Sequence, residues 1–135
     1  MKKNLSVVIL LVLAAVIAVG SVTVLGPCVH ADGSEAPCSR AGRGILIAGC
    51  VLAVLAVLIL LFRTPAARII LFFLSLCASA AGILLPGAIL PLCRMDTMHC
   101  RAVMQPAMII LFAAALIVSV VGIITERSRS RRSRA

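Results

Sequence analysis

Residues 44–62 read GILIAGCVLAVLAVLILLF, a run that contains no Asp, Glu, Lys, Arg or His. The hydrocarbon core of a bilayer is about 30 Å thick, so a helix needs roughly 20 apolar residues to cross it. In lipid, every backbone N–H and C=O must find a partner within the segment, and a helix supplies these partners. The run therefore predicts a transmembrane helix.

Three more runs of this kind occupy residues 5–25, 69–90 and 107–125. Of the 135 residues, 63% are hydrophobic and 13% are charged, a composition too apolar for a soluble domain. We therefore expect an all-α protein, a four-helix transmembrane bundle with two short extracytoplasmic loops that bear cysteines. The first run is longer than the apolar part of a signal peptide, about 7–15 residues, so we expect a retained helix.

The chain divides into a four-span membrane domain, residues 1–125, and a basic tail, residues 126–135. Nine Lys and Arg residues lie on the side of the two termini and of the turn at 63–68, whereas four lie in the other two loops. Because basic residues are enriched in cytoplasmic loops, the richer side is assigned to the cytoplasm. We expect a multi-pass protein of the cytoplasmic membrane, a bacterial inner membrane, with both termini cytoplasmic.

The basic tail could bind anionic lipid head groups through its arginines. The favoured expectation is a solvated, disordered flank, because blocks of like charge usually remain in water. It contains no aromatic residue on which a base could stack. The net charge of +9 therefore indicates membrane topology, and no nucleic-acid partner is expected.

Four cysteines fall in the two outer loops: Cys28 and Cys38 in the first, Cys93 and Cys100 in the second. An even number of cysteines facing an oxidising compartment predicts disulfides. Pairing within each loop and pairing between the loops are both open, and the short separations favour pairs within each loop. The remaining two cysteines, within the second and third runs, are expected to be free, buried and apolar.

Small residues recur at four-residue spacing inside the predicted spans, where they would let helix backbones approach closely. The spans carry no ionisable side chain, which argues against a proton relay or an ion-coupled transporter acting alone. The loops offer no soluble-type catalytic set, so we expect no catalytic residue, no cofactor and, on balance, no enzyme. The small-residue pairs are Gly49 and Ala53, Ser75 and Ser79, Ala78 and Gly82, and Ala115 and Ser119.

Two chemical alternatives remain for the outer loops. Four spans with paired outer cysteines resemble quinone-linked thiol–disulfide oxidoreductases of the DsbB and vitamin-K epoxide reductase type, although the Cys-x-x-Cys of those families is absent. The stretch Cys93-Arg-Met-Asp-Thr-Met-His-Cys100 also gathers thiols, thioethers and an imidazole, which are ligands for copper(I). The metal alternative requires reduced cysteines, so the disulfide hypothesis predicts no metal site.

The same stretch, running on through Arg101 to Pro106-Ala107, resembles the signature of a prokaryotic four-span family, domain of unknown function 4418. The family pattern places His and an aromatic residue after the second cysteine of the first loop, where this chain has Ser39 and Arg40. The resemblance implies paired cysteines in both outer loops and an accessory role beside an ABC-type export permease.

We therefore expect an accessory or interaction subunit that contacts the lipid bilayer and a membrane protein partner such as an ABC permease. Its oligomeric state is left open. Once bridged, the second outer loop would be rigid and could present a fixed contact surface at little ordering cost. The candidate contact residues are Arg94, Asp96, Met98, His99 and Arg101.

Overall fold

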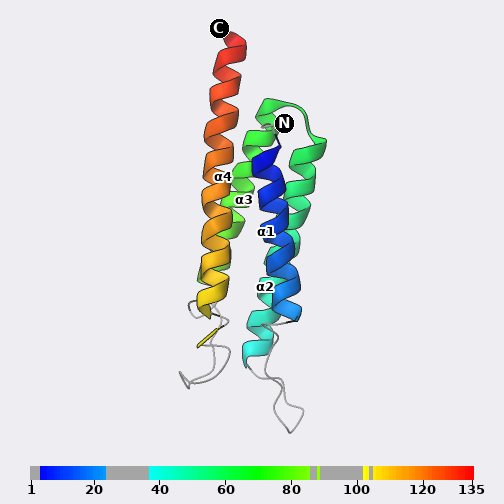
Figure 1. Ribbon diagram of the computed structural model, residues 1–135, viewed down its shortest axis with the longest axis vertical. Helices are drawn as coiled ribbons and strands as arrows, with labels where there is room; N and C mark the ends of the chain where they lie inside the picture. Colours follow the sequence, from blue (N-terminus) through cyan, green and yellow to red (C-terminus); the bar gives the residue numbers. More distant parts are fainter. Residues whose placement is uncertain (1–3, 24–36, 86–87, 89–101, 104) are drawn as a thin grey trace.

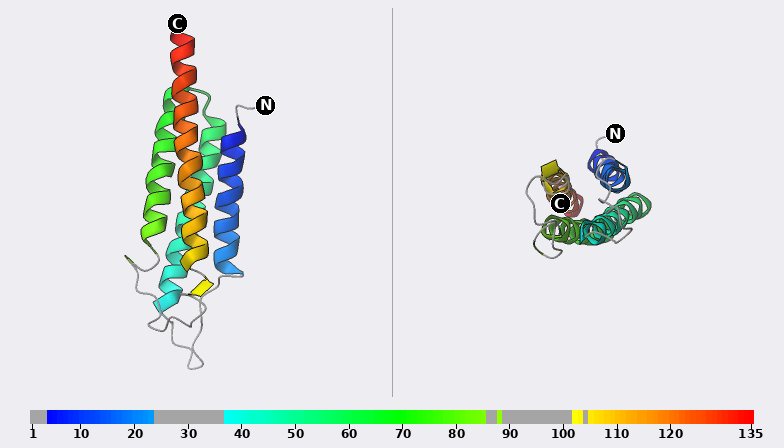
Figure 2. Two further views of the ribbon diagram at one scale, coloured as in Figure 1. Left: turned by 60° about the vertical axis from the view of Figure 1, so that its left-hand side comes forward. Right: turned by 90° about the horizontal axis from the view of Figure 1, so that it is seen from below.

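Four helices make up the computed structural model, which describes residues 4–23, 37–85, 88, 102–103 and 105–135, with backbone alone at 37–41. In chain order they are α1 (Leu5–Val22), α2 (Pro37–Leu61), α3 (Pro65–Leu84) and α4 (Gln105–Arg134). Helix α1 packs closely with α2 and α3 with α4, and the two pairs join along α2 and α3 and along α1 and α4 (Figures 1 and 2). The described residues form no strand, so the all-α expectation is confirmed.

All four helices are long and apolar enough to cross a bilayer, which confirms four spans and a multi-pass membrane protein. The helix bounds differ from the predicted spans. Helix α2 begins at Pro37 rather than residue 44, and α3 begins at Pro65 rather than residue 69. Proline is favoured at the first helical position, where it donates no N–H and has a fixed φ suited to a helix. These helices therefore begin at prolines outside the apolar runs.

The expectation of a disordered tail is wrong, because α4 continues without a break to Arg134. Adding residues to an existing helix avoids the unfavourable nucleation step, and basic side chains in the last turn complement the negative end of the helix dipole. A helix of 30 residues is about 45 Å long at about 1.5 Å per residue. Its end projects past the α2–α3 turn (Figure 1).

Buried positions alternate in steps of three and four along the helices, an average period of 3.5 residues. This period indicates left-handed, coiled-coil-like packing in which each helix presents one narrow seam to its neighbours. Large apolar side chains cover the outer faces of the helices, as expected for contact with lipid. On α1 the buried positions are Val7, Leu10, Ala14, Ile17 and Ser21, and on α3 they are Phe72, Ser75, Ser79 and Gly82.

The thiols of Cys50 and Cys77 are free but exposed on the outer faces of α2 and α3, so the expectation that they are buried is wrong. Cys50 directly follows the buried Gly49, and Cys77 lies between the buried Ser75 and Ser79. In the repeat of buried positions in steps of three and four, both thiols therefore point away from the bundle interior. A thiol is apolar enough to face lipid without a hydrogen-bond partner.

Candidate functional site

The interface between α3 and α4 is built from two reciprocal contacts of a phenylalanine ring with a glycine. A Cβ added at Gly122 would meet a ring carbon of Phe72 at 2.4 Å, and one added at Gly82 would meet Phe112 at 2.4 Å. Both rings are almost completely buried. Only glycine therefore lets each ring lie this close to the opposite backbone.

Between these ring contacts lies a small polar centre. Ser75 Oγ and Ser119 Oγ share a buried hydrogen bond of 3.2 Å across the two helices. Within the helices, Ser79 Oγ donates to the carbonyl oxygen of Ser75, and Ser119 Oγ donates to that of Ala115, both at 2.8 Å. The expected close packing at Ser75 and Ser79 and at Ala115 and Ser119 is thus confirmed.

One sequence pattern occurs on both helices, and it fixes their antiparallel register. Residues 72–82 read F-x2-S-x3-S-x2-G and residues 112–122 read F-x2-A-x3-S-x2-G. Gly82 lies ten residues after Phe72, and Phe112 lies ten residues before Gly122. One antiparallel alignment of α3 with α4 therefore accounts for both ring contacts. The pattern is visible in the sequence, but the four-residue spacing of small residues does not by itself reveal the repeat.

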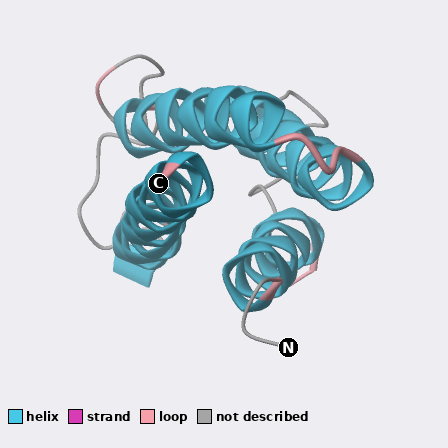
Figure 3. Cartoon of the chain, turned by 90° about the horizontal axis from the view of Figure 1, so that it is seen from above, coloured by secondary structure: helices cyan, strands magenta, loops and turns pink. Residues whose placement is uncertain are grey.

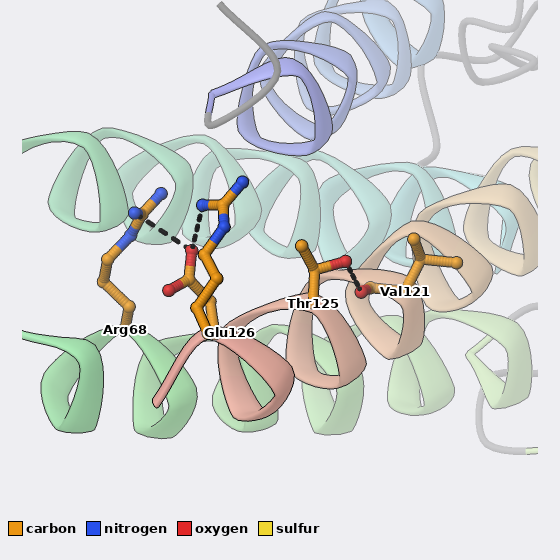
Figure 4. Close-up of polar contacts among 5 residues, drawn as sticks. Arg68, Val121, Thr125 and Glu126 are labelled. Atoms are coloured by element: carbon orange, nitrogen blue, oxygen red, sulfur yellow. Dashed lines mark hydrogen bonds and ion pairs between the residues drawn. The ribbon is translucent and has the colours of Figure 1, made fainter. Parts of the chain in front are cut away.

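The same register places Arg68 opposite Glu126, because Arg68 precedes Phe72 by four residues and Glu126 follows Gly122 by four. Arg68 Nη1 lies 3.0 Å from Glu126 Oε1, and Arg129 Nη1 lies 3.4 Å from the same oxygen (Figure 4). The Arg68 and Glu126 side chains are only 12% and 7% exposed. A buried ion pair therefore closes the α3–α4 seam at one end of the bundle.

We call this end, where α1 begins, α2 ends, α3 begins and α4 runs past, the charged end of the bundle (Figures 1 and 3). A pocket of about 490 Å³ opens there, and the described residues contribute three guanidinium groups and one carboxylate to its wall. All four helices or their ends contribute to it. The residues that line it are Asn4, Leu60, Phe62, Arg63, Arg68, Glu126 and Arg129.

This charged pocket is the candidate functional site, and the sequence did not predict it. From the sequence, Arg68 lies in the turn at 63–68 and counts only toward the topology, and Glu126 lies in the basic tail with no role of its own. One signal was present: Glu126 is the only acidic residue on the side assigned to the cytoplasm. This single carboxylate lies among nine basic residues and directly follows an apolar run, which indicates that it pairs with a specific basic side chain of the chain.

The predicted loop site lies largely outside the described residues, so its disulfides and contacts stay predictions. Cys38 is placed in the first turn of α2, and its side chain is not described. Within the described ranges, no three His, Cys, Asp or Glu side chains gather as a metal site. The predicted site residues outside the described ranges are Cys28, Cys93, Cys100, Arg94, Asp96, Met98, His99 and Arg101.

Comparison with known proteins finds a family match across most of the chain. The model of the family DUF4418, described as a domain of unknown function, matches residues 10–125. The match begins at Leu10 within α1, covers α2 and α3, and ends at Thr125 within α4, one residue before the ion-paired Glu126. No curated protein and no solved structure gives a significant match.

Proposed function

The chain belongs to the DUF4418 family, and we propose that it acts as an accessory subunit of a membrane complex, with an ABC-type export permease as partner. In this proposal the charged end faces the cytoplasm, and the two cysteine-bearing loops, stapled by disulfides, face the other side. The permease partner comes from the family resemblance in the second outer loop.

The observation that carries the proposal is the extension of α4 beyond the bundle. Past Glu126 the helix presents arginines on its exposed surface, and no other described helix accompanies it (Figure 2). A helix that is polar all round commonly bridges between domains. This one is formed before any partner binds, so docking on it would cost little ordering entropy. The exposed arginines are Arg127, Arg131, Arg132 and Arg134.

The direct test is site-specific photocrosslinking in native membranes. A photoreactive residue would replace Ser128 or Ser133 on the α4 extension or His99 in the second outer loop. We expect the His99 probe and at least one of the Ser128 and Ser133 probes to capture one foreign membrane protein, identified by mass spectrometry as a permease. The same probe at the fully buried Ile17 is the control and should capture no other protein.

A truncation after Arg129 keeps both ion pairs of Glu126 and so separates the role of the extension from that of the bundle. We expect the truncated chain to insert and fold but to lose the partner on affinity purification in mild detergent. Replacing the four exposed arginines with lysine keeps the charge and should retain the partner. Crosslinks to the same chain alone, at every probe position, would refute the accessory role.

A further inference from the structure

Among the described residues, one edge of the Arg68 guanidinium has no partner. Nη1 engages Glu126, whereas Nε and Nη2 are buried and make no hydrogen bond within this described part of the chain. Buried polar atoms of this kind are uncommon, and an unpaired donor on a charged group is costly. Nε–H and one Nη2–H point the same way along one side of the guanidinium, so they form a fork that matches two oxygens of a phosphate or carboxylate.

The surroundings of this fork favour an anion. Among the described residues, Arg63, Arg68 and Arg129 line the pocket against one carboxylate, that of Glu126, so this part of its wall carries a net charge of +2. Asn4, which also lines the pocket, precedes α1 and makes no side-chain cap hydrogen bond. The first N–H groups of a helix carry partial positive charge and attract anions.

The position of the pocket favours a lipid anion. It lies where α2 and α3 join, so its wall combines the last apolar residues of a span, Leu60 and Phe62, with the arginines. Leu61 and Phe62 are strongly exposed beside it, as side chains that contact acyl chains would be. Phosphate groups of phospholipids lie at this depth, just outside the hydrocarbon core.

We propose that the charged pocket binds the phosphate of an anionic phospholipid, held by the Nε/Nη2 edge of Arg68 together with Arg63 and Arg129. The long side chains of Arg63 and Arg129 rearrange around the phosphate as it enters, and Glu126 keeps the Arg68 guanidinium in place through Nη1. A phosphodiester supplies the two oxygens that the fork of Arg68 matches. The site thus selects lipids by the charge of their head group, and it does so next to the α3–α4 seam.

Native mass spectrometry of the delipidated full-length protein tests this proposal with phosphatidylglycerol and phosphatidylcholine. We expect the first phosphatidylglycerol to bind at least about tenfold more tightly than phosphatidylcholine, a difference equal to about one charge-assisted contact. Arg68→Lys keeps the charge and removes the fork, so it should weaken phosphatidylglycerol binding about tenfold. Arg134→Gln removes a charge outside the pocket and should leave this affinity unchanged.

Arg63→Gln is the second variant, because Arg63 is exposed and lies outside the Glu126 ion pairs, so the fold should tolerate it. It should weaken phosphatidylglycerol binding several-fold even if Arg68→Lys fails to fold. Excess inorganic phosphate should leave the lipid bound, and displacement by phosphate would overturn the lipid assignment. Equal binding of both lipids, or wild-type affinity in Arg63→Gln, would overturn the proposal and leave Arg68 and Arg129 with only a structural role beside Glu126.

Discussion

The two helix pairs of the bundle pack in different ways. The α3–α4 interface combines two ring–glycine contacts, a serine hydrogen bond and the Arg68–Glu126 ion pair. The buried positions of α1 and α2 are almost all aliphatic, and a Cβ added at Gly49 of α2 would meet Ile17 Cγ2 of α1 at 3.1 Å.

This difference matters because apolar burial does little to favour one helix alignment over another in lipid. Lipid tails are as apolar as leucine, so packing shape and hydrogen bonds decide how spans associate. Aliphatic seams can repack after a shift at modest cost. The α3–α4 interface cannot shift without separating charges and moving rings onto positions with side chains. We infer that α3–α4 sets the register of the bundle and that α1–α2 adapts to it.

The largest effect is expected at the ion pair. Replacing Glu126 with leucine leaves the Arg68 guanidinium buried without its carboxylate, and we expect the unfolding free energy to fall by about 3 kcal/mol. Titration with a denaturing detergent in mixed micelles measures this change. Arg68→Leu combined with Glu126→Leu should restore most of the loss, since replacing both charges by apolar groups is often nearly neutral. A double variant as unstable as the single one would contradict this account.

The next largest effect on the unfolding free energy comes from a glycine substitution, which can be made in each of the two interfaces and compared. Gly122→Ala places a Cβ against the buried Phe72 ring, and we expect it to cost about 2 kcal/mol by overpacking. Gly49→Ala meets its neighbours at 3.1–3.3 Å and should cost less than about 1 kcal/mol. The same detergent titration compares them. Equal losses at both glycines would remove the distinction between the two helix pairs.

Phe72→Leu supplies a rescue for Gly122→Ala. The smaller, flexible side chain makes room for the new methyl group, so the double variant should be more stable than the sum of the two single changes implies. A positive coupling of about 1 kcal/mol is expected for residues in direct contact. Additive losses would show that the alanine is accommodated without moving the ring.

A smaller effect is expected at the serine pair. Ser75→Ala and Ser119→Ala should show a coupling energy of about 0.6 kcal/mol in a double-mutant cycle, the usual size for a hydrogen bond between spans. The control pair is Ser75 with Thr125, whose hydroxyl donates within its own helix to the Val121 carbonyl oxygen at 2.7 Å. That pair should show no coupling.

The smallest effect concerns the outer faces. Cys50→Ala and Cys77→Ala should each change the unfolding free energy by less than about 0.5 kcal/mol, since neither thiol packs in the seam. Titration with the denaturing detergent measures both changes. A larger loss at either position would show that its thiol packs against protein and does not face lipid.

The four spans could be predicted because length and apolarity alone decide them in a bilayer. The helical tail could not, since its arginines indicate solvated coil while its order follows from the helix already present before Glu126. The charged pocket depends on the alignment of α3 with α4, which places Arg68 beside Glu126 from distant parts of the sequence. The orientation of Cys50 was open to prediction from the seam repeat, because it directly follows the buried Gly49.

The register of α3 against α4 is the central claim, and disulfide trapping tests it most directly. In a chain without other cysteines, Ser75→Cys with Ser119→Cys places two thiols where the hydroxyl oxygens lie 3.2 Å apart. We expect rapid and nearly complete crosslinking within one chain under mild oxidation, seen as a mobility shift that reductant reverses. The offset pair Ser79→Cys with Gly122→Cys, two helical turns out of register, should stay reduced. Crosslinking of the offset pair in preference to the aligned pair would contradict the register, and with it the placement of the charged pocket.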